Sequence, residues 1–244
     1  MPRFFVQASL ENVEKGQKVR IDGKDARHIQ KSLRMNIGES LMICDGIGYD
    51  AETVVDAFDG DTVVLRVIRA FANQTEPTVK VTLYQGLPKG DKLETIIQKC
   101  VELGVTEIVP VVMSRSIAKP GDKIQNKLER WQKISDEAAG QSGRGILPKV
   151  REPISFDRAL KDWENEKVLV CYEKGGQPLG KSVSPQNGRI SFVVGPEGGI
   201  SEEEIERMKQ TGAVIVSMGP RILRTETAPI AALAVLMEKT GNLG

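Results

Sequence analysis

The residues best suited to chemistry lie in two loops near the C-terminal end, each after an apolar strand. Residues 195–200 read Gly-Pro-Glu-Gly-Gly-Ile, and residues 219–228 read Gly-Pro-Arg-Ile-Leu-Arg-Thr-Glu-Thr-Ala. In an open α/β sheet, ligands bind beyond the carboxyl ends of the strands. We therefore expect a ligand to lie at these loops.

The first loop does not suit a phosphate. It has neither the Lys-Ser/Thr pair of a P-loop nor the G-x-G-x-x-G spacing of a dinucleotide site. Pro196 removes one backbone donor, and Ser201 with Glu204 predicts a capping box that supplies the next helix with its own anion. A ligand that is uncharged or cationic at the loop fits better. S-adenosylmethionine, which has a sulfonium and no phosphate, meets this condition.

The exposed backbone of Gly195, Gly198 and Gly199 would allow a planar base to approach closely. Glu197 could contact a hydroxyl or a positive centre. The alternative is a tight strand-to-helix turn that holds no ligand.

The second loop carries more charge than a helix start requires. One cap, Thr225 or Thr227, would suffice. Arg221 or Arg224 could stabilise an anion on a substrate base, and Glu226 could accept a proton or fix the loop. The alternative is that these groups form only internal salt bridges, Arg224 with Glu226 or Arg221 with Glu197.

The elements that would position both loops alternate between strand and helix. Strands are predicted at 79–84, 108–113, 168–172, 190–194 and 214–218, and helices at 91–103, 124–139, 201–211 and 227–239. Asp91 and Glu94 predict a capping box on the first of these helices. Such alternation favours an α/β domain, with a mostly parallel sheet and helices on both faces.

The N-terminal part differs. Short strands separated by Asp-Gly turns occupy residues 19–70 and predict a small barrel or meander with one short helix at 25–33. A polar linker at 73–77 ends in proline. We therefore expect one domain at 1–72 and another at 73–244.

Composition limits the class of protein. The chain has 244 residues, a net charge of +1, three well-separated cysteines and one histidine. These numbers argue against a disulfide framework and a zinc site, and no apolar run approaches the roughly 20 residues that span a bilayer. We expect a cytoplasmic protein without metal or membrane segment.

Positive charge is concentrated near the N-terminus. Residues 15–34 contain seven basic and two acidic side chains. Such a basic stripe is typical of RNA backbone contact, although a solvated helix face would look the same. A second basic set flanks Gly-containing loops further along and could order on RNA: Arg115, Lys119, Lys123 and Arg144.

Taken together, the two loops resemble the C-terminal signature of the SPOUT methyltransferases. Within that superfamily, the chain is most similar to the RsmE family of small-subunit ribosomal RNA uridine-N3 methyltransferases. The resemblance extends over essentially the whole chain and includes residues 2–6, 28–34, 89–104, 130–134 and 141–144.

The resemblance implies a C-terminal SPOUT-type domain with a trefoil knot and a small N-terminal PUA-like β-barrel that binds RNA. It implies a homodimer that uses S-adenosyl-L-methionine to methylate N3 of a specific uridine in 16S ribosomal RNA, in the assembled 30S subunit. Two rivals are a SPOUT enzyme acting on another RNA site and a non-catalytic RNA-binding or ribosome-assembly factor. A third rival is a nucleotide-dependent α/β enzyme, which is disfavoured because this chain lacks a phosphate-binding motif.

The loops and the resemblance together predict three groups of site residues. The catalytic residues are Arg221, Arg224 and Glu226. The cofactor-binding residues are Tyr172, Glu173, Val194, Gly195, Pro196, Glu197, Gly198, Gly199, Met218, Gly219, Ile222, Leu223, Arg224, Thr225, Thr227 and Ala228. The RNA-binding residues are Arg3, Lys24, Arg27, His28, Lys31, Arg34, Lys89, Arg115 and Arg144.

Overall fold

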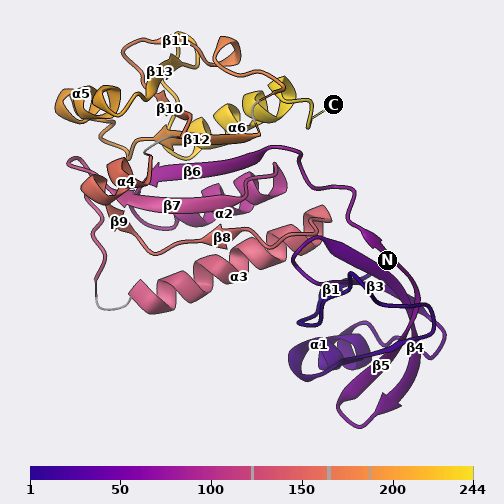
Figure 1. Cartoon of the computed structure of the whole chain (residues 1–244). Coiled ribbons are helices and arrows are strands. Elements are labelled where there is room, and N and C mark those ends of the chain that lie inside the picture. Colours follow the sequence, from indigo (N-terminus) through magenta and orange to yellow (C-terminus); the bar gives the residue numbers. More distant parts are fainter. Residues whose placement is uncertain (122–123, 164–165, 187, 244) are drawn as a thin grey trace. The chain divides into compact units, whose positions relative to one another are not determined.

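The chain forms two compact units. The computed structural model describes residues 1–121, 124–163, 166–186 and 188–243 (Figure 1). One unit comprises Met1–Glu76 with Ala139–Leu147, and the other comprises Pro77–Ala138 with Pro148–Gly244. The first unit therefore includes a segment that the sequence pattern placed in the second domain.

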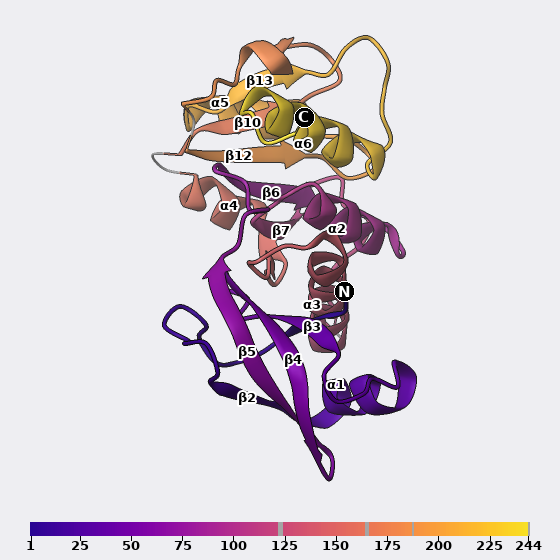
Figure 2. The same ribbon diagram turned by 90° about the vertical axis from the view of Figure 1, so that its right-hand side faces the viewer.

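The N-terminal unit is built on a five-stranded sheet in the order β1-β3-β4-β5-β2 (Figure 2). β1 runs parallel to β3, and the remaining pairs are antiparallel. The Asp59-Gly60 turn joins β4 to β5, with Gly60 at a φ of 60°. Such a positive φ favours glycine. The strands are β1 (Arg3–Phe5), β2 (Lys18–Ile21), β3 (Ser40–Cys44), β4 (Tyr49–Asp59) and β5 (Thr62–Ala72).

One short helical segment packs against this sheet. It runs through α1 (Gly23–Arg27) into a π-helical turn, η1 (His28–Ser32). Ala26 and Ile29 face the core and are fully buried. The predicted helix over 25–33 is thus correct in kind and begins earlier.

The C-terminal unit contains an eight-stranded sheet in which every pairing is parallel. Its main order is β11-β13-β10-β12-β6-β7-β8, and β9 also pairs with β7. Because the strands are parallel, the loops that follow β12, β10 and β13 emerge at one edge of the sheet. The strands are β6 (Lys80–Gly86), β7 (Glu107–Val112), β8 (Lys149–Val150), β9 (Ile154–Ser155), β10 (Val168–Cys171), β11 (Gln177–Pro178), β12 (Arg189–Val194) and β13 (Val214–Ser217).

Helices cover both faces of this sheet, as expected (Figure 2). One face carries α2 (Lys92–Glu102) and α6 (Thr227–Lys239), which pack together. The other carries α4 (Phe156–Asp162) and α5 (Glu202–Gln210), whose apolar side chains share a core with Trp163 and Tyr84. The remaining helical elements are α3 (Ile124–Ser142) and η2 (Leu179–Lys181).

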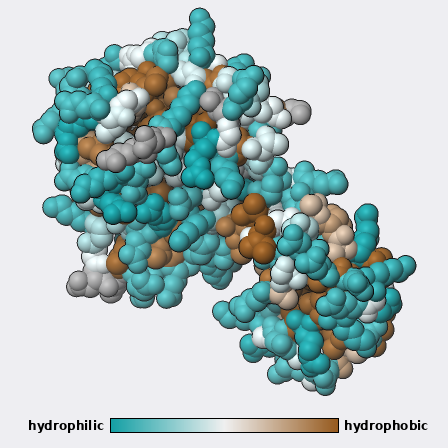
Figure 3. Space-filling model, in the orientation of Figure 1, coloured by the Kyte–Doolittle hydropathy of each residue, from teal (hydrophilic) through white to brown (hydrophobic). Residues whose placement is uncertain are grey.

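Helix capping follows the sequence pattern only in part. The Ser201–Glu204 capping box on α5 is present. The expected box on α2 is wrong, because Asp91 makes no side-chain cap and Glu94 instead pairs with Arg130 at 2.7 Å. Hydrophilic side chains cover most of the face in Figure 3, as expected for a protein whose apolar side chains are largely buried.

Candidate functional site

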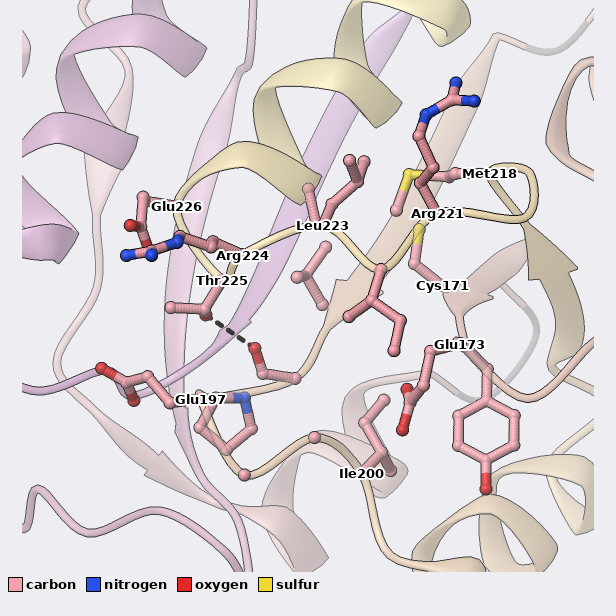
Figure 4. A pocket seen from close by; sticks show the side chains of 18 of the residues that line it. Cys171, Glu173, Glu197, Ile200, Met218, Arg221, Leu223, Arg224, Thr225 and Glu226 are labelled. Atoms are coloured by element: carbon pink, nitrogen blue, oxygen red, sulfur yellow. Dashed lines mark hydrogen bonds between the residues drawn. The ribbon is translucent and has the colours of Figure 1, made fainter.

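The two loops enclose one cavity of about 460 Å³, within the C-terminal unit (Figure 4). Small-molecule sites are typically about 300–1,000 Å³. Every predicted cofactor residue lines it except Thr227, which begins α6 and is exposed. The lining residues that the cofactor prediction omitted are Lys92, Cys171, Ile200, Arg221 and Glu226.

The first loop is held rigidly by Glu204. This carboxylate accepts hydrogen bonds from the backbone N–H and hydroxyl of Ser114, at 2.8 and 2.9 Å, and from the same groups of Ser201, at 3.0 and 2.9 Å. Burial raises the pKa of Glu204, but these hydrogen bonds outweigh burial and leave the pKa below 4.5. Glu204 thereby ties the end of β7 to the loop.

The glycines of the first loop are closely packed by their neighbours. A Cβ on Gly195 would lie 2.8 Å from Cγ1 of Ile200, and one on Gly198 would lie 3.0 Å from Cβ of Arg115. Gly199 has a φ of 69°. Arg115, an expected RNA contact, is exposed and donates from Nη1 to the carbonyl of Gly198 at 3.1 Å. A larger residue at Gly198 would therefore disturb the loop whether or not a ligand binds there.

A buried bridge joins the two loops at their inner end. The hydroxyl of Thr225 donates to the carbonyl of Gly195 at 2.8 Å, the dashed line in Figure 4. Nε2 of Gln85, a fully buried residue in β6, donates to Oγ1 of Thr225 at 3.1 Å and to the Gly195 carbonyl at 3.3 Å. Thr225 therefore bonds across the loops and does not cap α6, where Glu226 occupies the N-cap position without a side-chain cap.

Sequence reasoning missed Gln85. The sequence feature that could have indicated it is an amide side chain near the carboxyl end of a largely apolar strand, because ligand loops follow the carboxyl ends of strands in a parallel sheet.

A second bridge joins the loops at their outer end. Nζ of Lys92 lies 2.8 Å from Oε1 of Glu197 and 4.0 Å from Oε2 of Glu226. The backbone N–H of Lys89 also donates to Oε1 of Glu197, at 3.0 Å. Burial raises the pKa of Glu197, but the hydrogen bonds from Lys92 and the backbone outweigh burial and lower the pKa. Lys89, an expected RNA contact, is itself exposed.

The arginines of the second loop are not engaged in salt bridges. Arg221 and Arg224 are exposed, and neither pairs with a carboxylate among the described residues. The expected alternative, an Arg224–Glu226 or Arg221–Glu197 pair, is therefore not formed. Figure 4 shows Arg224 beside Glu226 and Arg221 on the opposite side of the loop, so the structure does not bring the three predicted catalytic residues together.

Two further side chains in the wall of the cavity, Cys171 and Glu173, bear on the charge of its ligand. Burial raises the pKa of Cys171 to about 12, so its thiol stays neutral. The carboxylate of Glu173 is exposed, and no ion pair is found for it within the described ranges. A cationic ligand group would thus meet an unpaired carboxylate, which fits the sulfonium of S-adenosylmethionine.

The expected RNA-binding residues of the N-terminal unit fall into two groups. Lys24, Arg27, His28, Lys31 and Arg34 are exposed and lie on or directly after the α1–η1 segment. The ring of His28 meets Phe4 edge-on, with centroids 6.0 Å apart.

Two other basic residues of the stripe are paired across the sheet. Lys18 contacts Asp56 and Arg20 contacts Asp59, each at 2.9 Å. Of the second basic set, Lys119 is exposed, whereas Lys123 lies outside the described residues.

Arg144 is buried and Arg3 is partly buried, which corrects the expectation of a mobile, RNA-facing Arg144. Arg144 is 3% exposed and pairs with Glu76 at 2.8 Å. Arg3 pairs with Asp50 at 2.6 Å and donates to the carbonyl of Arg144 at 3.0 Å. Buried arginines need such partners because an unpaired buried charge is costly. The contacts of Arg144 with Glu76 and Arg3 hold segment 139–147 within the N-terminal unit.

Comparison with known proteins defines the class. The RNA methyltransferase domain family matches residues 74–237, and the RNA methyltransferase PUA domain family matches residues 21–68. The chain is therefore an RNA methyltransferase with a PUA-like N-terminal module, as the sequence predicted. The rival interpretation as a nucleotide-dependent α/β enzyme is wrong.

Full-length relatives narrow the family further. The ribosomal RNA small subunit methyltransferase E of Bacillus subtilis (strain 168) is 37% identical and covers 98% of this chain and 97% of its own length. Its namesake from Synechocystis is 37% identical over 85% of this chain and 68% of its own length. The structure of the Neisseria gonorrhoeae enzyme of that name, bound to S-adenosyl methionine, is 33% identical, with a TM-score of 0.88 over 98% of this chain and 97% of that one. The chain belongs to the ribosomal RNA small subunit methyltransferase E family.

Two features are absent from the described residues. No helix there is long and apolar enough to cross a membrane. No group of three or more potential ligands there could hold a metal ion.

Proposed function

We propose that this chain transfers a methyl group from S-adenosyl-L-methionine to N3 of a uridine in 16S ribosomal RNA, within the assembled 30S subunit in the cytoplasm. One observation carries the proposal. Two loops are joined around one cavity, and both arginines of the second loop are left without a carboxylate partner within the described ranges. A loop built only to start a helix has no need of such groups.

The cofactor site is the cavity between the loops. The lining residues of the first loop, 194–199, and of the second loop, 218–225 with Ala228, are proposed to hold the cofactor, with Tyr172 and Glu173 beside them. Thr227 is proposed to act indirectly, through the start of α6. The cofactor supplies a methyl group on a positively charged sulfur.

This chain's own residues must make uracil N3 reactive. Neutral uracil carries a proton on N3 and is a poor nucleophile there, so some group must take that proton while another stabilises charge on the carbonyl oxygens. Arg224 is proposed to stabilise that charge, and Glu226 lies next to Arg224 in the same loop. Arg221, on the other side of the loop, is proposed to contact the RNA near the target base.

The RNA is proposed to contact the exposed basic face of α1–η1. Lys24, Arg27 and Lys31 recur there at helical spacing, His28 lies between the last two, and Arg34 follows the segment. Positive charge on one face provides backbone affinity without sequence specificity. Lys89 and Arg115 are proposed to add contacts from the C-terminal unit.

We also propose a homodimer. Ile230, Ala231, Ala234 and Val235 form an apolar and partly exposed face of α6, in a helix whose other face is buried. A two-fold contact between α6 helices would cover this face. The trefoil knot and the domain limits 1–72 and 73–244 remain predictions.

The test is methyl transfer to unmodified small ribosomal subunits and to free 16S RNA, with nucleoside analysis by mass spectrometry. N3-methyluridine formed from the particles is the expected product. A methyl group on another atom or RNA would favour the rival SPOUT enzyme. Binding of RNA without binding of cofactor would favour the non-catalytic factor.

A further inference from the structure

Lys92 reaches both ligand loops from a third element of the fold. It is the first residue of α2, and its side chain is 38% exposed. Its ammonium lies 2.8 Å from Glu197 of the first loop and 4.0 Å from Glu226 of the second, and both carboxylate side chains are 25% exposed. The three groups form one partly shielded cluster in the wall of the cavity, and in such a place charge interactions are stronger than on an open surface.

The two carboxylates of this cluster are not equivalent. Oε1 of Glu197 accepts hydrogen bonds from both Nζ of Lys92 and the backbone N–H of Lys89. Oε2 of Glu226 is buried and has no hydrogen-bond partner among the described residues. An oxygen that accepts charged and backbone donors is a poor place for a proton, because protonation would weaken those hydrogen bonds. Glu226 is therefore the better proton acceptor of the two.

Glu226 also has a positive neighbour on its own loop. Figure 4 shows the side chain of Arg224, which is exposed, beside the Glu226 carboxylate.

We propose that Lys92 is a positioning residue for methyl transfer: it holds Glu197 and Glu226 in one cluster, so that Glu197 stays bound while Glu226 accepts the proton that uracil N3 loses. The inference rests on the proposed function. In this step, N3 forms a bond to the methyl carbon as the bond from that carbon to sulfur breaks. The N3 proton passes to the Glu226 carboxylate, and the sulfur keeps its electron pair and becomes neutral.

Removal of the ammonium has a defined consequence. Without Lys92, Glu197 and Glu226 repel each other, and each binds a proton at a higher pH. Glu226 would then be protonated, and unable to accept the N3 proton, over a wider acidic range. The cavity itself would persist, because Gln85 and Thr225 still join the loops at their inner end.

The experiment compares Lys92→Met, Lys92→Arg and Glu226→Gln with wild-type full-length protein. Lys99→Met is the matched control, since Lys99 lies on the same helix, pairs with Glu102 at 2.9 Å and is not part of the cavity. For each variant, calorimetry gives the affinity for S-adenosylmethionine, and methylation of small subunits gives kcat and KM as functions of pH.

Lys92→Met is expected to bind cofactor within about threefold of wild type, to lower kcat about 10–100-fold with little change in KM, and to shift the acid limb of kcat to higher pH. Lys92→Arg should restore most of kcat and return the acid limb towards that of wild type. Glu226→Gln should lose the acid limb and lower kcat by about 100-fold or more. Lys99→Met should match wild type throughout.

An unchanged acid limb in Lys92→Met, or full kcat in Glu226→Gln, would overturn the inference. A Lys92→Met variant that binds no cofactor would also overturn it, because Lys92 would then serve the loops and not the proton. Wild-type protein that binds cofactor but methylates no RNA would instead reject the proposed function, and the inference with it.

Discussion

The two ligand loops are built in opposite ways. The first loop is fixed from several sides: Glu204 accepts four hydrogen bonds from two serines, and Arg115 donates to Gly198. The second loop is attached mainly near its end, through Thr225 and Glu226, and Ile222 in its middle is 82% exposed. A rigid loop gives the cavity its shape, whereas a loosely attached loop leaves charged side chains available to a substrate. Removal of the contacts that fix the first loop should therefore reduce stability, whereas removal of the exposed arginines of the second loop should reduce activity.

The largest expected effect is that of Arg224→Ala. If Arg224 stabilises charge on the uracil carbonyls, kcat should fall about 10²–10³-fold, as for other stabilisers of developing anions. The midpoint of urea unfolding should barely change, because Arg224 is exposed and unpaired within the described part of the chain. Arg189→Ala is a matched control, since Arg189 is 65% exposed and pairs only at the surface with Glu166. Equal activity of the two variants would contradict the role of Arg224.

Glu204→Gln should have the largest effect on stability. Loss of a charged acceptor for four hydrogen bonds should lower the free energy of unfolding by about 2–3 kcal/mol at neutral pH, as measured by urea denaturation. Glu202→Gln, which removes an exposed partner of Lys174, should cost less than about 1 kcal/mol.

The contribution of Glu204 to the stability of the folded protein should also depend on pH. Its pKa in the folded protein lies below the ordinary value of 4.5. Its stabilising contribution is thus fully present above about pH 4.5 and decreases as the pH falls through the folded value. The difference in melting temperature between wild type and Glu204→Gln should accordingly narrow in acid. A constant difference down to about pH 3 would argue against an ionised Glu204.

The inner bridge tests how far the two loops are coupled. Thr225→Val removes a donor to Gly195 and an acceptor for Gln85, and should cost about 1–2 kcal/mol. In a double-mutant cycle with Gln85→Leu, the two costs should fall short of additivity by about 1 kcal/mol. Strict additivity would mean that the loops are not joined through this pair.

The smallest expected effect is that of Ile222→Ala. If the cofactor packs against this exposed side chain, its affinity should fall by roughly 3–10-fold, about 1 kcal/mol of lost apolar contact. Ile117→Ala is the control, because Ile117 is 64% exposed and lies outside the cavity. Calorimetry that gives the same cofactor affinity for both variants would place Ile222 outside the cofactor site.

Local sequence signals predicted most of the individual elements. Apolar runs marked the long strands, and spacing marked helices α2, α3, α5 and α6. The short elements β8, β9, β11 and α4 were missed, because two to seven residues contain too little periodicity to separate from loop. The capping box on α5 was found because it is local, whereas that on α2 failed because Arg130, from another helix, takes Glu94.

By itself, the sequence determined the alternation of strands and helices and the composition of the two ligand loops, because both depend on neighbours along the chain. The tertiary structure alone decided which polar groups are used for what. In the folded chain Arg144 is buried against Glu76, and the Thr225 hydroxyl donates to the Gly195 carbonyl. Lys92 donates to Glu197, which lies over a hundred residues away in the sequence. The reason is that a charged or polar side chain finds its partner through space, and burial of that partner depends on the whole packed fold.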